Sequence, residues 1–267
     1  MADFLSTMAS SSLLRADDAR TRYGETGLDS MVPSAPPAAP LELSTEGFDL
    51  IAEVKLASPS EGRLAPSAES AEAVAGRAAL LSSAGPAGLS VLTEPDRFDG
   101  NLSHLEAATD AVSLPVMRKD FLVDPIQVTE ARVRGASGVL LIARILDPST
   151  LGEMVDLALG LDMFCLVELF DEADIDRASS VFDRQILVGV NARNLRTLRV
   201  NTERHESIVR QLPSHLPLVA ESGINTAVDA SRVASLGYRL ALVGTALTKA
   251  DEPASLARSM VIAGRAA

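Results

Sequence analysis

The sequence predicts an α/β fold, a closed (β/α)8 TIM barrel with an N-terminal extension. From Phe48 to the end of the 267-residue chain, short apolar runs alternate eight times with segments of helical period. Such alternation implies parallel strands joined by right-handed crossovers, and eight units favour a closed barrel over an open sheet. No G-x-G-x-x-G follows the first strand, which counts against a dinucleotide-binding sheet.

Residues 1–47 form the predicted extension, and residues 48–267 form the catalytic barrel. Within the extension a helix is predicted over 13–23, because serines 10–12 offer N-caps and Ala, Leu and Arg favour helix. Residues 24–40 are rich in proline and predict a linker or a draped segment. Two interpretations stay open: a poorly ordered leader, or a helix that covers the mouth of the barrel.

The barrel elements follow from short apolar runs and helical periodicity. The predicted strands are 50–55, 88–92, 115–118, 138–142, 163–168, 186–190, 217–220 and 240–243. The predicted helices are 67–83, 101–111, 125–134, 148–160, 171–179, 202–211, 225–236 and 253–264. Two helices have strong starts, because Asp124 and Asp147 each precede a proline at the first helical position.

Composition excludes several classes of protein. Hydrophobic residues make up 47% of the chain, enough for the core of one large domain. No apolar run reaches the length of a membrane span, the start lacks a secretory signal, and Cys165 is the only cysteine. We therefore expect a cytoplasmic protein without a membrane partner. The formal net charge of −12 and the lack of a basic stretch exclude nucleic acid as a partner.

Polar side chains follow the predicted strands where each strand ends, which is the face that carries the site in such barrels. Glu53 and Lys55 end the first strand and point to the same side, because they are two residues apart. The others are Lys119, Glu168, Asn191, Arg193 and Glu221. Counting back by two places Leu166 and Gly189 inside the barrel, and the glycine leaves space beneath the site.

Ser222-Gly223 and Gly244-Thr245 open the loops after strands seven and eight. Many barrels bind phosphate there through backbone N–H groups, although each pair could also be an ordinary cap. Asp120 and Asp124 are interpreted as turn and capping residues. A single charged strand end is more often a solvated terminus. Three carboxylates and two of the three lysines at one mouth, however, must be paired or meet a ligand.

The motifs around these residues resemble those of the indole-3-glycerol-phosphate synthase family. Seven stretches agree in order and spacing over residues 48–250: EVKLASPS, MRKDFLVDPxQ, EARxxGASGVLLI, LVE, GVNARNL, AESGI and VGTAL. The resemblance implies a carboxy-lyase of tryptophan biosynthesis that needs no cofactor or metal. Its phosphorylated small-molecule substrate would be 1-(2-carboxyphenylamino)-1-deoxyribulose 5-phosphate, which closes to indole-3-glycerol phosphate and loses carbon dioxide and water.

Matched motif by motif, the resemblance makes Lys119 the general acid at the ribulose carbonyl oxygen. Glu168 and Lys55 would be the acid and base groups of ring closure and dehydration, without assignment to single steps. Glu53 would support Lys55, and Asn191 and Glu221 would hold the substrate hydroxyls and the catalytic network. Arg193 and Ser58 would contact anions, and Phe98 and Phe121 would lie beside the aromatic ring. The implied phosphate-binding residues are Ser222, Gly223, Gly244 and Thr245. A monomer or weak homodimer is expected.

The sequence departs from the family at Leu56, Ile126, Phe170 and Ala192, and residues 24–47 match poorly. A paralogue that acts on a substituted anthranilate-derived substrate in a specialised indole pathway therefore stays open. Phosphoribosylanthranilate isomerase is disfavoured, because its usual strand-end cysteine and aspartate are replaced by Glu53/Lys55 and Asn191. A non-catalytic barrel that binds a phosphorylated ligand is the remaining alternative, and intact Lys55, Lys119 and Glu168 argue against it.

Overall fold

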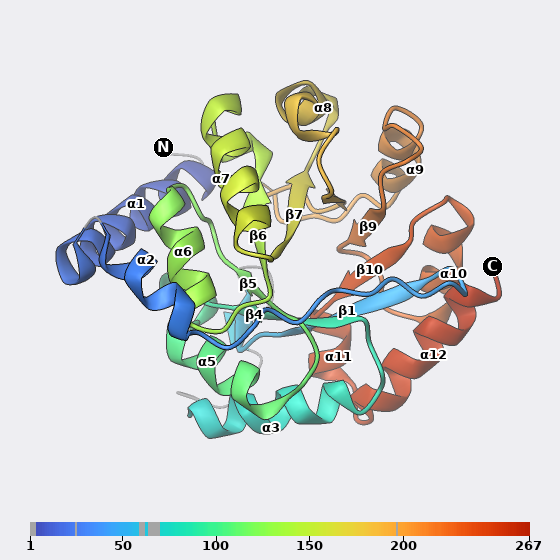
Figure 1. The fold of residues 1–267 in the computed structure, drawn as a ribbon. Helices are drawn as coiled ribbons and strands as arrows, with labels where there is room; N and C mark the ends of the chain where they lie inside the picture. The colour runs from blue at the N-terminus through green and yellow to red at the C-terminus, as the bar shows by residue number, and fades with distance from the viewer. Residues whose placement is uncertain (1–3, 25, 59–61, 64–69, 196) are drawn as a thin grey trace.

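Eight parallel strands close into a barrel in the order β1-β10-β9-β8-β7-β6-β5-β4, and the helices surround it (Figure 1). The computed structural model describes residues 4–24, 26–58, 62–63, 70–195 and 197–267. The strands are β1 Asp49–Val54, β4 Gly88–Leu92, β5 Val116–Lys119, β6 Gly138–Ile142, β7 Phe164–Leu169, β8 Leu187–Asn191, β9 Leu218–Glu221 and β10 Leu240–Val243. The predicted (β/α)8 barrel is confirmed, and each predicted strand overlaps an observed one.

Helices follow the strands as the periodicity predicts. The outer helices are α3 Ala71–Ser82, α5 Leu102–Ala111, α6 Pro125–Val133, α7 Pro148–Gly160, α8 Glu172–Ala178, α9 Glu203–Val209, α10 Ala227–Ser235 and α12 Pro253–Arg265. Short 3-10 turns are η1 Val32–Ser34, η2 Ala143–Ile145 and η3 Ser179–Val181. The two predicted N-caps are present, because the carboxylates of Asp124 and Asp147 accept hydrogen bonds from the first-turn amides. Within the described residues no helix is long and apolar enough to cross a membrane.

The strands alternate between two layers of core. Ile51, Leu166 and Val219 point into the barrel, where they pack with Met117 and Leu140. Residues of opposite parity pack outward against the helices; the outward layer includes Leu50, Val54, Cys165, Val167 and Ala220. Because Glu53, Glu168 and Glu221 have the parity of the inner layer, they cap the barrel interior at its carboxyl end.

The N-terminal helix is longer than the sequence predicts. Helix α1 spans Phe4–Tyr23, so it begins nine residues before the predicted start at residue 13. Its buried side chains recur at helical spacing, at Leu5, Met8, Ser12, Ala16 and Ala19. The predicted start was wrong because serines 10–12, interpreted as N-caps, lie inside the helix. Since α1 packs against α6, the described part of the extension begins with a docked helix, which agrees with the second of the two interpretations left open by the sequence.

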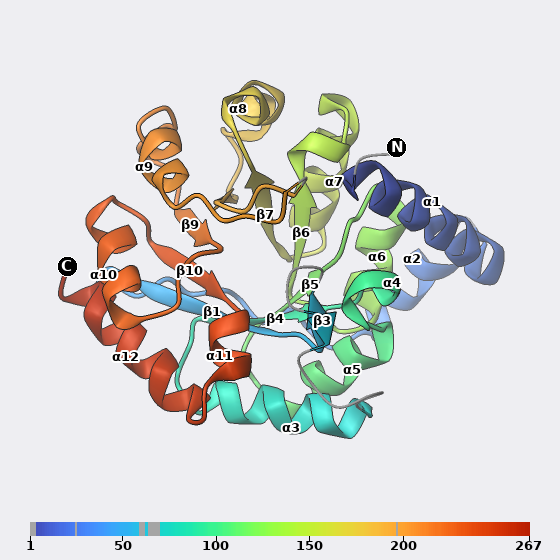
Figure 2. The ribbon, with the colours of Figure 1, turned by 180° about the vertical axis from the view of Figure 1, so that it is seen from behind.

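The segment between α1 and β1 contains α2 Gly27–Met31 and η1, and from residue 35 it runs along the barrel without regular structure. It is tied there by a hydrogen bond from the Ala39 amide to Ser137 Oγ, and Leu41 and Leu43 pack against the inner core. At the opposite end, the hairpin β2 Ala57–Ser58 and β3 Gly62–Arg63 follows β1, α4 Pro95–Phe98 follows β4, and α11 Thr245–Lys249 follows β10. These short elements face the viewer in Figure 2.

Candidate active site

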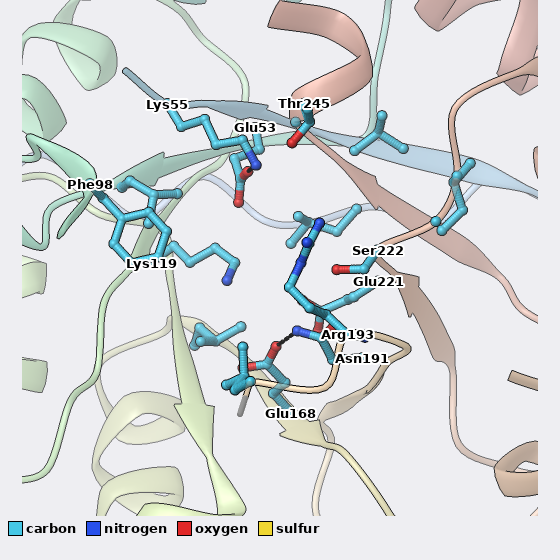
Figure 3. Close-up of a pocket in the computed structure, with 18 of the residues that line it drawn as sticks. Glu53, Lys55, Phe98, Lys119, Glu168, Asn191, Arg193, Glu221, Ser222 and Thr245 are labelled. Atoms are coloured by element: carbon cyan, nitrogen blue, oxygen red, sulfur yellow. Dashed lines mark hydrogen bonds and ion pairs between the residues drawn. The ribbon is translucent and has the colours of Figure 1, made fainter. Parts of the chain in front are cut away.

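One pocket at the carboxyl ends of the strands gathers the predicted site residues (Figure 3). Thirteen of the fourteen line it: Glu53, Lys55, Phe98, Lys119, Phe121, Glu168, Asn191, Arg193, Glu221, Ser222, Gly223, Gly244 and Thr245. The remaining residue, Ser58, belongs to β2 through its backbone, and its side chain lies outside the described part of the chain. The barrel therefore brings together residues that lie up to 192 positions apart, from Glu53 to Thr245.

Glu53 and Lys55 form an ion pair at the carboxyl end of β1. Lys55 Nζ lies 2.8 Å from Glu53 Oε1, and the Glu53 side chain is buried. Burial pushes the pKa of Glu53 up, but Lys55 and Lys119 together pull it below its usual value. Gly244 makes this placement possible, because a Cβ at that position would strike Glu53 Oε1. Besides any role at an anion, Gly244 thus leaves space for a site carboxylate.

Asn191 holds Glu168 in place. Its Nδ2 donates to Glu168 Oε1 at 2.5 Å, and its Oδ1 accepts from the Arg193 backbone amide at 2.9 Å. Both ends of the Asn191 amide are therefore used, which sets the orientation of the side chain. Figure 3 marks the bond between Asn191 and Glu168 with a dashed line.

Glu221 lies beside this pair on β9 and is also buried. Burial and the nearby Glu168 carboxylate raise the pKa of Glu221 well above its usual value. Its Oε1 has no hydrogen-bond partner among the described residues. A Cβ on Gly189 would strike this oxygen, so the expected space beneath the site is present and the Glu221 carboxyl fills it.

Lys119 ends β5, and its ammonium points into the pocket among the carboxylates (Figure 3). Burial alone would lower the pKa of Lys119, but Glu168, Glu53 and Glu221 outweigh it and raise the pKa above the usual lysine value. The geometry keeps Lys119 cationic, which suits a proton donor or a partner for an oxygen that gains negative charge.

The loops after β9 and β10 bring backbone groups to the pocket. Ser222 and Gly223 both have positive φ, 63° and 80°, a conformation that is uncommon for serine and indicates a constrained turn. A Cβ on Gly223 would also collide with Thr202 and Val200, so glycine is required there for two reasons. Gly244 precedes α11, whose first residue is Thr245. Both predicted loops therefore face the same pocket.

Three phenylalanines form the apolar side of the pocket. Phe121 stacks at a tilt on Phe98, with ring centroids 6.1 Å apart, and edge to face with Phe4 at 5.9 Å. Phe4 is the first described residue of α1, and no sequence pattern predicted it as a site residue. The other missed apolar residues are Leu92, Leu140, Ile142, Leu195, Leu198, Ile224, Leu242, Val243 and Ala246. Leu195 lies within the GVNARNL stretch, so that motif could have indicated it as a site residue. Phe4 lies in none of the seven motifs.

The family model that matches the chain and the two relatives given below carry the same name. A family model described as indole-3-glycerol phosphate synthase matches residues 28–260. The protein of that name from Rhodococcus opacus (strain B4) is 41% identical, with 86% of this chain and 84% of that protein covered. The one from Mycobacterium ulcerans (strain Agy99) is 40% identical, with 94% and 92% covered. The chain belongs to the indole-3-glycerol phosphate synthase family.

Membership of the indole-3-glycerol phosphate synthase family confirms the activity, the enzyme class and the biosynthetic context that the motifs implied: the chain is a carboxy-lyase of tryptophan biosynthesis. Two solved structures share the fold alone. A 3-hexulose-6-phosphate synthase aligns with a TM-score of 0.61 at 18% identity, covering 81% of this chain and 99% of that one. The enzyme of that name from Salmonella typhimurium aligns at 0.59 and 14%, covering 81% and 98%.

A buried histidine supports β9 from behind. His205 of α9 lies fully inside the protein, and its Nε2 is 3.2 Å from the Glu221 carbonyl oxygen. A carbonyl can only accept, so Nε2 carries the proton, and Nδ1 faces Arg232. Burial lowers the pKa of His205 from 6.5 to about 4. The imidazole is thus a neutral donor to the strand end that carries Glu221.

The shift at His205 predicts an acid-sensitive fold. In the unfolded chain His205 takes up a proton at its usual pKa of 6.5, and in the folded chain at about 4. The contribution of neutral His205 to the stability of the fold is therefore complete above pH 6.5 and is lost as the pH falls toward 4. Between pH 7.5 and 5 we expect the free energy of unfolding to drop by about 2 kcal/mol more in the wild type than in His205→Gln. Urea unfolding at the two values measures this, with His215→Gln as the control. Equal losses in wild type and His205→Gln would refute it.

Proposed function

We propose that the pocket closes the indole pyrrole ring of 1-(2-carboxyphenylamino)-1-deoxyribulose 5-phosphate, with Lys119 as the general acid. The observation that carries the proposal is the cationic Lys119 held among three carboxylates beside an aromatic wall. Donation of its proton to the ribulose carbonyl oxygen makes the carbonyl carbon electrophilic. The aromatic carbon that bears the carboxylate then attacks it, and a carbon–carbon bond forms.

Two losses complete the reaction. Carbon dioxide leaves the ring carbon that made the attack, and the electron pair of the broken bond restores the aromatic ring. The hydroxyl made from the carbonyl then accepts a proton and leaves as water. The adjacent CH2 carbon, which is bonded to nitrogen, gives up a proton to a base, and the electron pair of that C–H bond forms the double bond of the pyrrole. Glu168 and Lys55 handle the proton transfers of these steps, since each is held by a neighbour, Asn191 and Glu53 respectively.

The remaining pocket residues position the substrate. Glu221 takes a ribulose hydroxyl, because its Oε1 is buried and without a partner among the described residues. Backbone groups at Ser222-Gly223 and Gly244-Thr245 hold the phosphate, and Arg193 and Ser58 contact anionic groups. Phe98 and Phe121 pack on the anthranilate ring, and Phe4 extends that wall.

An assay of the purified protein with this substrate tests the proposal. Indole fluorescence should rise with time and be unchanged by EDTA, because the proposed steps use only proton donors and acceptors. Ring-substituted substrates measured in parallel show whether the phenylalanine wall accepts larger rings, as a specialised pathway would require. Substrate that binds but yields no product would overturn the proposal.

We also infer that the protein works in the cytoplasm as a monomer or weak homodimer. The catalytic groups proposed for the pocket, Lys119, Glu168 and Lys55, all come from one chain, which supports a site that needs no second subunit.

A further inference from the structure

A buried cluster of charges surrounds the backbone of Lys119. Its two neighbours, Arg118 and Asp120, are each 2% exposed. Arg118 points to the opposite side of β5 from Lys119 and reaches α6, where it donates to the Gln127 carbonyl and pairs with Glu130 at 3.0 Å. Both neighbours of the proposed general acid are therefore held by buried polar contacts. Residues that only form a turn would not need such contacts.

Asp120 is the centre of this cluster. Its Oδ1 accepts from the Phe121 amide and from Arg15 Nη2, both at 2.8 Å. Its Oδ2 accepts from Thr93 Oγ1 at 2.8 Å and from Arg118 at 3.4 Å. The prediction that Asp120 is only a turn residue is therefore incomplete, because its carboxylate joins β5, the end of β4 and helix α1.

The same contacts hold Lys119 itself. The Thr93 amide donates to the Lys119 carbonyl at 3.0 Å, while the Thr93 hydroxyl donates to Asp120. Hydrogen bonds from Thr93 thus hold both the main chain of Lys119 and the side chain of the next residue, Asp120. The position from which its side chain enters the pocket depends on how Asp120 is held.

Helix α1 contributes one of the donors to Asp120 and also one wall of the pocket. Arg15 pairs with Asp120, and Phe4 of the same helix packs on Phe121, which directly follows Asp120. A second ion pair, Arg20 with Asp124 at 2.6 Å, ties the same helix to the same loop further from Lys119. Of these two ion pairs, only that of Arg15 reaches a residue next to Lys119.

We propose that Arg15 and Asp120 are positioning residues, whose ion pair makes the placement of Lys119 depend on the docking of helix α1 over the pocket. The inference rests on the function proposed above for Lys119. It assigns the N-terminal helix a part in the chemical step besides covering the ring. Arg118 still neutralises Asp120 when Arg15 is removed, so the fold survives the loss while the loop after β5 loses one of its restraints.

Arg15→Met tests the coupling, with Arg20→Met as the matched control on the same helix. Methionine keeps length and helix propensity and removes the charge. The single-turnover rate of ring closure, with enzyme in excess, should fall about tenfold in Arg15→Met, a fraction of what a 1 Å misplacement of a catalytic group costs. The enzyme concentration at half-saturation should change little, and Arg20→Met should stay within about twofold of wild type. Arg15→Lys, which keeps the charge, should recover most of the rate.

A second measurement needs no activity. Amide hydrogen exchange at Thr93 and Phe121 should be faster in Arg15→Met than in Arg20→Met, because these amides bond to Lys119 and Asp120. Equal effects of the two methionine variants on exchange would overturn the inference. So would an Arg15→Met variant that changes the enzyme concentration at half-saturation but leaves the single-turnover rate at the wild-type value. If the wild type forms no product, the proposed function fails, and the exchange comparison still decides the coupling.

Discussion

Lys119→Met is expected to lower the rate of ring closure by about a thousandfold, within the range that a positioned general acid contributes. The variant loses both the proton for the ribulose carbonyl oxygen and the cation among Glu53, Glu168 and Glu221. Because those carboxylates raise the pKa of Lys119 above its usual value, the wild-type rate should not fall in mildly alkaline buffer through loss of this proton. Stopped-flow or steady-state indole fluorescence measures both effects.

Lys249→Met is the control for this prediction. Lys249 is the remaining lysine besides Lys55. It lies exposed at the end of α11 and is not among the residues that line the pocket. The ring-closure rate of Lys249→Met should stay within about twofold of wild type, because surface substitutions usually have small effects. A folded Lys119→Met protein that keeps a tenth or more of the wild-type rate would remove Lys119 from the role of general acid.

Glu168→Gln is expected to slow the reaction by about a hundredfold, because an amide has nearly the shape of the carboxylate but cannot take up a proton. The glutamine oxygen can still accept from Asn191 Nδ2, so the side chain keeps its place. Removal of the charge also removes the largest of the carboxylate effects that raise the pKa of Lys119. The alkaline limb of the rate profile should therefore move to lower pH.

Glu153→Gln, an exposed position on α7, controls for a general effect of losing one negative charge. The full pH profile of single-turnover rates distinguishes the two effects of Glu168→Gln. If the plateau rate is unchanged and only the alkaline limb moves, Glu168 tunes Lys119 and is not itself a proton acceptor.

The barrel and most of the candidate site could be predicted from the sequence, because both depend on local patterns. Each strand is a short apolar run whose parity decides which side chains face inward. Once the strands are known to be parallel and closed, residues such as Glu53, Lys119 and Glu168 must meet at one mouth. Strand-end position alone therefore indicated the pocket, although 115 residues separate Glu53 from Glu168 in the chain.

Long-range contacts decided the rest. Phe4 reaches the pocket only because α1 docks on α6, and its serine-containing first half carries a weak apolar pattern. Asp120 has the pattern of a turn residue until Arg15 and Thr93 meet it. The sign of the Lys119 pKa shift is a balance of burial against three carboxylates from three other strands. Such a balance depends on distances between strands, which only the closed barrel sets, whereas the identity of the charged residues was determined by the sequence itself.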